Sequence, residues 1–405
     1  MAVIANRIKG FADMYPPQSS LFTRMENTAR EIFSRYGFVE LRTPVLEYTD
    51  LFKRSIGEET DVVQKEMFTF PDRKGRMMTM RPEATAGVMR AYVEDARYSR
   101  ESVSRLFTTG PMFRYERPQK GRLREFVQCD IDILGDSSPN AEVELIDVTA
   151  RALLKIGFTG FTVNINDRRI LRGMLESMGF AADTLDSVCI TFDKMDKIGA
   201  EGVKAELTEK QLPESAIQAL ADFIAAGDVT LDAVAARCAD PAIADDLKYV
   251  LATANTLAAG RYQVAYCPSL VRGQGYYTGM VFEVTCPQFS GAVAGGGRYD
   301  NMVGKFLGVQ VPAVGFSIGF ERVCGILLEQ GYQIPGAKQK IALLYGKDTD
   351  FPAVLSKAAA LREQYNVTVL PQGKKLGKQL GQLEAAGFAG AAFMDKDEVK
   401  IFAQQ

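Results

Sequence analysis

The segment FRYERPQKGRLREF, residues 113–126, concentrates charged side chains that could bind phosphate groups. Alternate residues of a strand share one face, so Arg114 and Glu116 are expected to point the same way. An arginine fork suits a phosphate, and a neighbouring carboxylate can select an amino-bearing partner. The cations of the intervening loop could instead reach nucleic-acid phosphates. Charge content alone is also compatible with a solvated surface hairpin.

Two glycine-rich segments suggest backbone that approaches a small molecule closely. VRGQGYYTG begins at Val271 and AGGGRYD begins at Ala294, and each contains an arginine and at least one tyrosine. Glycine lets the backbone approach a ligand, while Arg272 and Arg298 would add affinity for anions. The two segments together predict a small-molecule pocket, although a lone GGGR is also typical of a tight turn.

The segment VGFSIGFER is expected to form a strand that leads into a helix. Its last residue, Arg322, could pair with a neighbouring acid, lie over a base or hold a phosphate. The residues alone leave these three roles open.

The chain contains no histidine. This excludes Ser-His-Asp triads, Cys-His dyads, histidine-liganded metals and histidine general bases. A reaction must therefore depend on carboxylates, arginines, lysines, tyrosines, backbone amides or groups of the substrate itself. The absence of histidine is compatible both with chance and with avoidance or deliberate removal of this residue.

Composition places the chain among globular proteins of more than one domain. Its 405 residues are 47% hydrophobic and 24% charged, and that length corresponds to about two to three domains. The 48 Lys and Arg against 50 Asp and Glu do not predict a nucleic-acid partner from net charge, although a local basic patch is compatible with one.

No apolar run is long enough for a membrane span, and no secretion signal is expected. The six cysteines lack C-x-x-C spacing, which favours a reducing cytoplasm.

The elements that would position these segments follow from hydrophobic spacing. A helix is expected from Ser20, ending at Gly37, and the next stretch is extended with Pro44 inside it, which argues for a sheet edge or an interface. Residues 67–83 predict a hairpin, and residues 113–126 would join two further strands. Residues from about 168 to 260 are rich in Ala, Leu, Asp and Glu and predict a helical insertion.

A linker is expected at GYQIPGAKQ, residues 331–339. Beyond it, the order βαβαββ predicts a small α/β domain over residues 338–405.

The motifs resemble those of class II aminoacyl-tRNA synthetases and, within that class, the histidyl-tRNA synthetases. GFVELRTPVLE, FRYERPQKGRLREF and GFSIGFER resemble the three class motifs. RPEATAG, LFKRSIGEETDVVQKEMFTF, EFVQCDIDILG, VRGQGYYTG and AGGGRYD are similar to segments of the histidyl enzymes in order and spacing. The resemblance implies an α+β catalytic domain on an antiparallel sheet over residues 1–330, with a shortened anticodon-binding-like domain over 338–405.

The resemblance also implies site residues, substrates and partners. The catalytic residues would be Arg114 and Arg272, and the arginine and carboxylate contacts to ATP would come from Arg114, Glu116, Arg122 and Arg322. Histidine would be bound by Glu83, Thr85, Gln128, Asp132, Tyr276, Tyr277 and Tyr299. Arg117 and Gln119 would meet the acceptor end of tRNA(His). The implied protein is a cytoplasmic homodimer that uses ATP with Mg²⁺, has no protein-liganded metal and does not associate with membranes.

Three departures from the family pattern keep alternatives open. Gln274-Gly275 replaces a stretch in which the family frequently has an acid, Val127 lies where it often has a ring, and the C-terminal domain is short. One alternative is a histidine-binding regulatory subunit of ATP phosphoribosyltransferase, but such paralogues typically lack the terminal domain and the ATP-binding arginines. Another is a paralogue that transfers an activated amino acid to an acceptor other than tRNA.

Overall fold

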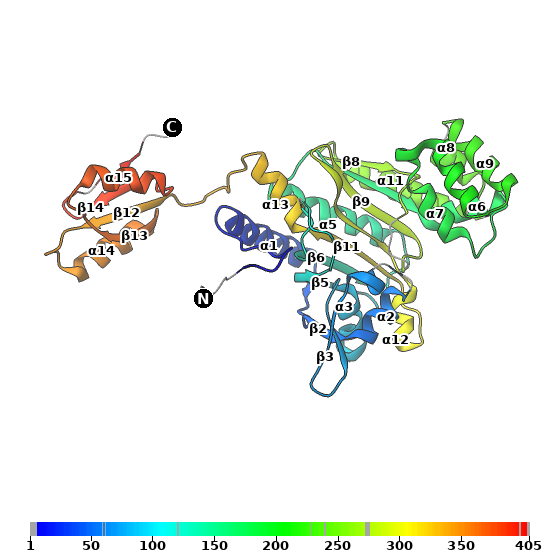
Figure 1. Ribbon diagram of the computed structural model, residues 1–405, viewed down its shortest axis with the longest axis horizontal. Coiled ribbons are helices and arrows are strands. Elements are labelled where there is room, and N and C mark those ends of the chain that lie inside the picture. Colours follow the sequence, from blue (N-terminus) through cyan, green and yellow to red (C-terminus); the bar gives the residue numbers. More distant parts are fainter. Residues whose placement is uncertain are drawn as a thin grey trace. The chain divides into compact units, whose positions relative to one another are not determined.

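The computed structural model describes residues 6–58, 60, 62–119, 121–227, 229–238, 240–271, 276–396 and 398–402 (Figure 1). The chain separates into two compact units, Met1–Tyr332 and Gln333–Gln405. Within the described residues, no helix is both long and apolar enough to cross a bilayer.

A large mixed sheet forms the centre of the first unit. Among the described residues, eight strands pair in the order β1-β5-β6-β11-β10-β9-β7-β8. Their bounds are β1 Val39–Glu40, β5 Ser104–Phe113, β6 Glu125–Leu134, β7 Thr162–Asp167, β8 Gln263–Tyr266, β9 Met280–Cys286, β10 Phe289–Arg298 and β11 Ala313–Gly319. The pairs β1–β5 and β7–β8 are parallel and the others antiparallel. The predicted α+β class on an antiparallel sheet is therefore confirmed.

Amphipathic helices supply the apolar side chains that pack with this sheet. Helix α1 (Gln18–Arg35) buries Leu21, Met25 and Phe33, as the spacing predicted. It contacts α5 (Asn140–Ile156) and α13 (Phe320–Glu329). Gly37 then takes a positive φ of 80°, a conformation that favours glycine, and allows the chain to leave the helix.

The stretch after α1 differs from the single extended segment that was expected. Pro44 lies between β1 and β2 (Leu46–Tyr48), which belong to different sheets. Strand β2 pairs with β4 (Met77–Met80), and β4 pairs with β3 (Phe68–Pro71) in the predicted hairpin. A proline cannot donate to a strand ladder, and here it occupies the passage from one sheet to the other. Helices α2 (Thr49–Ile56), α3 (Thr85–Glu94) and α12 (Asn301–Leu307) contact one another beside this small sheet (Figure 1).

Between β7 and β8 the chain is helical. The helices are α6 Arg168–Ser177, α7 Leu185–Phe192, α8 Met195–Glu209, α9 Glu214–Ala225, α10 Leu231–Ala235 and α11 Pro241–Ala258. Helices α6 to α9 are grouped together in Figure 1 (green), whereas α11 packs along β8 and α5. Short segments that complete the unit are the π-helix Val62–Glu66 and α4 (Ala96–Ser99).

The second unit is a three-layer α/β fold. Strands β12 (Lys340–Tyr345), β13 (Asn366–Pro371), β14 (Gly390–Phe393) and β15 (Lys400–Ile401) pair in the order β13-β12-β14-β15. Alternate residues of β12 face opposite ways. Ala342 and Leu344 pack with α15 (Leu376–Ala385), whereas Ile341 and Leu343 pack with α14 (Phe351–Arg362).

Arg298 has a different role from the anion binding that its glycine-rich segment suggested. It is buried at the end of β10 and donates to both carboxylate oxygens of Glu142 on α5, at 2.5 and 2.6 Å. It also donates to the Asp136 carbonyl oxygen at 3.0 Å. With its donors engaged inside the protein, Arg298 joins the sheet to α5.

Replacing Arg298 with alanine is expected to lower the free energy of unfolding by about 3–5 kcal/mol, because Glu142 would remain buried without its partner. The control is Arg35→Ala, which removes an ion pair to Glu31 between side chains that are 67% and 46% exposed. That change is expected to cost less than about 1 kcal/mol. Urea-induced unfolding measures both, and equal losses in the two variants would contradict the structural role of Arg298.

Candidate active site

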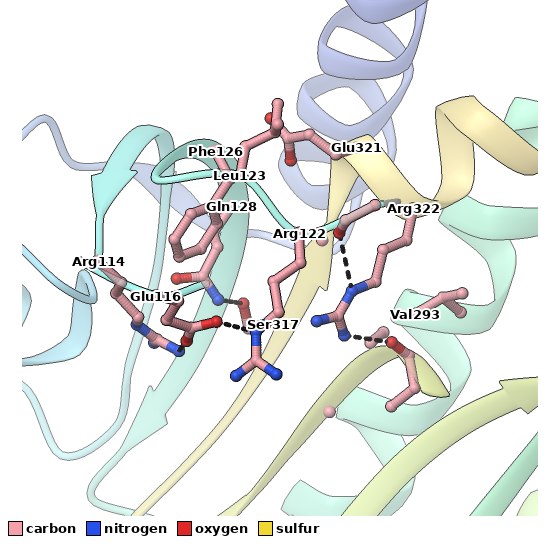
Figure 2. Close-up of a pocket in the computed structure, with 15 residues that line it drawn as sticks. Arg114, Glu116, Arg122, Leu123, Phe126, Gln128, Val293, Ser317, Glu321 and Arg322 are labelled. Carbon is pink, nitrogen blue, oxygen red and sulfur yellow. Dashed lines mark hydrogen bonds and ion pairs between the residues drawn. The ribbon is translucent and has the colours of Figure 1, made fainter. Parts of the chain in front are cut away.

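Two adjoining cavities lie over one face of the central strands of the large sheet. The arginine cavity, about 150 Å³, is bordered by Arg114, Glu116, Arg122 and Arg322 with residues of β6, β10 and β11 (Figure 2). The carboxylate cavity, about 40 Å³, is bordered by Glu83, Asp130 and Asp132 together with Tyr276, Tyr277 and Tyr299. Both cavities share Arg114, Gln128, Gly295 and Ser317 in their walls, so they form one continuous candidate site.

The β5–β6 hairpin positions the charged residues of the arginine cavity. Its ladder ends where Phe113 pairs with Glu125, and the following loop carries Arg114 and Glu116. The Glu116 carboxylate is held by Arg122 and lies 3.9 Å from the Arg114 guanidinium. Because the Glu116 side chain is only 8% exposed, this pairing offsets the cost of burying its charge.

Arg114 is fixed at the junction of the two cavities. Its Nε donates to the Pro82 carbonyl oxygen at 2.8 Å, and its guanidinium lies 5.3 Å from the centre of the Phe126 ring. The Nε is used in this backbone contact, whereas Nη1 lies 3.9 Å from the Glu116 carboxylate in the wall of the arginine cavity. An arginine held in this way presents a planar fork suited to a phosphate or carboxylate.

The strand-to-helix junction β11–α13 forms the opposite wall. Arg322 donates to the Ala292 carbonyl oxygen at 2.5 Å and to the Gly121 carbonyl oxygen at 3.4 Å (Figure 2). Glu321 accepts the Val127 backbone N–H at 2.7 Å. Burial raises the pKa of the Glu321 carboxyl to about 7. The helix start thus ties the β5–β6 hairpin to β10 and β11.

The carboxylate cavity holds three buried acids. Asp132 is 1% exposed and accepts the Tyr299 hydroxyl, and burial raises its pKa to about 8. Burial likewise raises the pKa of Asp130 to about 7 and raises the pKa of Glu83, whose carboxylate accepts the Ala86 N–H at 3.0 Å. Each shift has the same main cause, the cost of keeping a carboxylate away from water.

Three acceptors in this region have no hydrogen-bond donor among the described residues. They are Gln128 Oε1, Asp130 Oδ1 and Asp132 Oδ2, which come from alternate residues of β6. Buried acceptors are normally paired, so these three groups are available to a donor that is not among the described residues. A ligand with several N–H donors and a positive charge, such as an ammonium group, would satisfy these acceptors.

Glycine in β10 and β11 is required by close packing rather than by a turn. A Cβ at Gly315 would overlap Asp132 Oδ1, and a Cβ at Gly296 would overlap the Gly315 carbonyl oxygen. The GGGR sequence is therefore part of a strand in the wall of the site, and its tight-turn interpretation is wrong.

The structure brings most of the predicted site residues together. Around the two cavities lie Glu83, Thr85, Arg114, Glu116, Arg122, Gln128, Asp132, Tyr276, Tyr277, Tyr299 and Arg322. The two predicted tRNA contacts, Arg117 and Gln119, are exposed on the hairpin loop and line neither cavity. Arg272 lies outside the described residues, as do Gln274 and Gly275.

The sequence interpretation missed Asp130 and Ser317, which also line the site. Asp130 could have been found from strand periodicity, because Gln128 and Asp132 were already assigned and the residue between them in a period of two shares their face. Ser317 carried no comparable signal, since its place opposite Asp130 depends on the pairing of β6 with β11.

Sequence comparisons identify the relatives of this chain. A profile described as histidyl-tRNA synthetase matches residues 10–323. The histidine–tRNA ligase of Nitratidesulfovibrio vulgaris (strain DP4) is 43% identical over 360 residues, which cover 88% of this chain and 82% of that protein. The histidine–tRNA ligase of Solidesulfovibrio magneticus is 38% identical over 390 residues, covering 96% of this chain and 88% of that protein.

Solved structures show the same fold at lower identity. A histidyl-tRNA synthetase from Nostoc sp. PCC 7120 superposes with a TM-score of 0.79 at 22% identity, over 96% of this chain and 90% of that chain. A protein described as an ATP phosphoribosyltransferase regulatory subunit/histidyl-tRNA synthetase, from Bacillus halodurans, gives a TM-score of 0.77 at 19% identity, over 96% of this chain and 98% of that chain. At these identities the likeness concerns the fold alone, and it agrees with the class II synthetase fold expected from the three motifs. With the profile covering most of its length and relatives about 40% identical along most of it, this chain belongs to the histidyl-tRNA synthetase family.

Proposed function

We propose that this protein is a histidine–tRNA ligase, which activates histidine with ATP and transfers it to tRNA(His). The observation that carries the proposal is the position of Arg114 in the walls of both cavities. A single guanidinium there can contact the α-phosphate of ATP in one cavity and the carboxylate of an amino acid in the other. Those are the two groups that must meet when an aminoacyl-adenylate forms.

The activation step requires no protein histidine. A carboxylate oxygen of the amino acid attacks the α-phosphorus of ATP in line, a new P–O bond forms, and the bond to pyrophosphate breaks. We assign to Arg114 and Arg272 the stabilisation of charge that develops on the α-phosphate. Holding the two substrates in adjoining cavities would supply the positioning.

In the arginine cavity we assign ATP to Glu116, Arg122 and Arg322. Glu116 would accept from the adenine amino group, and Arg322 would lie over the base and reach the γ-phosphate. This assignment is supported by the network that surrounds Glu116, which keeps a carboxylate acceptor beside two cations in the cavity wall.

In the carboxylate cavity we assign the amino acid to the buried acids and tyrosines. Glu83 and Tyr277 would hydrogen-bond the imidazole nitrogens, while Gln128 and Asp132 would accept from the α-ammonium group. Thr85, Tyr276 and Tyr299 complete the wall, and Tyr299 already donates to Asp132. The unpaired acceptors of β6 support a cationic amino group at this end.

Magnesium is proposed to arrive with ATP. No group of three His, Cys, Asp or Glu in the described part of the chain is placed to hold a metal ion. The carboxylates of the arginine cavity are also engaged, Glu116 with Arg122 and Glu321 with the Val127 N–H. Mg²⁺ commonly binds substrate phosphates with few protein ligands, and such an ion would lower the charge of the phosphates beside Arg114.

In the second step the ribose hydroxyl at the tRNA end attacks the carbonyl carbon of the adenylate and forms an ester bond. The bond from that carbon to the phosphate oxygen breaks and AMP leaves, and the adenylate phosphate is assigned as the acceptor of the hydroxyl proton. Arg117 and Gln119 are proposed to contact the acceptor end. Their exposure on the loop beside the arginine cavity supports contact with a macromolecule rather than with ATP.

The regulatory-subunit function is less well supported than the ligase function. This chain keeps Arg114 and Arg322 in the cavity walls and retains a second α/β unit. Its relatives at 38–43% identity are named histidine–tRNA ligases.

Histidine-dependent exchange of pyrophosphate into ATP, followed by charging of tRNA(His), tests the proposal directly. The ligase function predicts both activities. Histidine binding without exchange would support the regulatory function, and exchange without charging would indicate transfer to a different acceptor.

We also propose a homodimer in the cytoplasm. The small sheet β2-β4-β3 exposes apolar side chains, and Leu46, Tyr48, Phe70 and Met77 are each 39–51% exposed. A second copy of this chain would cover such a face. The cysteines, all of which lie in described residues, form no disulfide, in keeping with a reducing compartment.

Changing Leu46 and Met77 together to glutamate is expected to shift the protein from dimer to monomer in sedimentation velocity. Placing the same two charges at Arg100 and Lys155, which are already polar and exposed and lie outside the small sheet, is expected to leave the dimer intact. A parent protein that sediments as a monomer would refute the proposal.

A further inference from the structure

Asp130 lies beside a hydrogen-bonded pair, Gln128 and Ser317, in the wall of the site. Ser317 is opposite Asp130 in the β6–β11 pairing, so the Ser317 hydroxyl and the Asp130 carboxyl lie on the same face of the sheet. The Gln128 Nε2 donates to Ser317 Oγ at 2.7 Å (Figure 2). All three residues line the carboxylate cavity, and Asp130 is 4% exposed.

The direction of a hydrogen bond between Ser317 and Asp130, and with it the role of Ser317 towards Gln128, depends on the charge of Asp130. An ionised carboxylate only accepts, and a hydroxyl has a single proton to donate. When Ser317 donates to ionised Asp130, its oxygen can only accept from Gln128, and the amide must present Nε2 to Ser317. Gln128 Oε1 is then the end that has no donor among the described residues and is left for a ligand.

We propose that Asp130 accepts the Ser317 hydroxyl and is thereby a positioning residue, which fixes the orientation of the Gln128 amide and selects a ligand with a protonated amino group. This inference rests on the proposed histidine activation and adds a determinant of substrate choice to it. With Asp130 ionised, Gln128 Oε1 and Asp132 Oδ2 both offer lone pairs to an ammonium group. A reversed amide would instead direct N–H donors at the same positive charge.

The charges around Asp130 are compatible with this role. Arg81 and Arg114 lower its pKa, while burial and Glu83 raise it, with a net value of about 7. A bound ammonium group would further favour the ionised form. A higher pH favours the ionised carboxylate, so the proposed arrangement is tested at pH 8.

The first test is Asp130→Asn in histidine-dependent pyrophosphate exchange at pH 8. Asparagine has nearly the same shape but can donate through its amide, so the Gln128 orientation is no longer determined. The KM for histidine is expected to rise by roughly 10- to 100-fold, the range of a hydrogen bond to a charged group, with kcat within about threefold of the parent. Ser317→Ala breaks the same connection and is expected to have the same effect.

A matched ligand separates this role from a general loss of structure. The analogue 3-(imidazol-4-yl)propionate lacks the amino group, so its inhibition constant is expected to be the same in the parent and in Asp130→Asn. The control variant Thr149→Val removes a buried hydroxyl that has no partner among the described residues and lines neither cavity. It is expected to change neither constant.

A second substitution provides a rescue that a purely structural residue would not allow. Glutamate at position 128 has two acceptor oxygens and cannot present a donor when ionised. Gln128→Glu combined with Asp130→Asn is therefore expected to recover most of the lost affinity for histidine, since the acceptor faces the ligand whatever Ser317 does.

The inference is overturned if Asp130→Asn leaves the KM for histidine unchanged, if the analogue loses as much affinity as histidine, or if Gln128→Glu gives no rescue. These results differ from failure of the proposed function, in which the unaltered protein itself would not catalyse histidine-dependent exchange.

Discussion

Arg114→Ala is expected to reduce histidine-dependent pyrophosphate exchange by about 10³-fold or more, the loss typical when an arginine that stabilises a transferring phosphoryl group is removed. The reason is its position in both cavities, where it can contact both reacting groups. The unfolding midpoint is expected to change little, because the backbone contact to Pro82 joins two loop positions at the site.

Two further variants sharpen this experiment. Arg114→Lys keeps the charge but loses the planar fork, and it is expected to recover only a small part of the activity. Arg100→Ala removes an exposed arginine that lines neither cavity and is expected to retain the parent rate. Exchange by Arg114→Ala within about tenfold of the parent would rule out the assigned charge stabilisation, since one lost contact of this kind should cost more.

Removing the second unit, by ending the chain after Pro335, is expected to abolish most tRNA charging at sub-saturating tRNA while histidine-dependent exchange persists. The described residues that line the two cavities all belong to the first unit. Residues 338–405 contain ten Lys and Arg against seven Asp and Glu. We propose that this unit is a second anchor for tRNA, a site that binds tRNA in addition to the catalytic unit. Its loss would leave one binding site in place of two and would weaken the overall affinity for tRNA.

A full-length variant examines the same anchor without truncation. Lys374, Lys375 and Lys378 are exposed at the start of α15. Reversing all three to glutamate is expected to raise the KM for tRNA and to reduce its dependence on salt, because contacts to phosphates release counterions. Reversal of Lys347, exposed elsewhere in the unit, is the control. Charging at the parent rate by both the truncated and the reversed proteins would show that the unit is not an anchor.

Much of the fold followed from local patterns in the sequence. The helix over Gln18–Arg35, the hairpins β3–β4 and β5–β6, and the βαβαββ order of the second unit were all predicted, because hydrophobic spacing and turn residues act over a few positions. The motifs also predicted the class II fold and most of the residues that line the site. The absence of histidine by itself limits the chemistry that the chain can perform.

What only the tertiary structure decided involves partners that are distant in the sequence. Arg298 belongs to a glycine-rich segment typical of ligand binding, yet the approach of Glu142 on α5 makes it a buried structural residue. Pro44 was expected within one extended stretch, but the chain passes there between two sheets. Local spacing cannot reveal either outcome, because it does not determine which surface an element meets.

The same reason explains Asp130 and Ser317. Strand periodicity places Gln128 and Asp130 on one face of β6. Ser317, which accepts a hydrogen bond from Gln128, comes from β11 and is 189 residues away from Gln128 in the sequence. The sequence by itself determined the chemical groups available to this protein and the local elements that carry them. Their arrangement into two cavities that meet at Arg114 was decided by the long-range pairing of strands, because that pairing alone brings distant side chains within hydrogen-bonding distance.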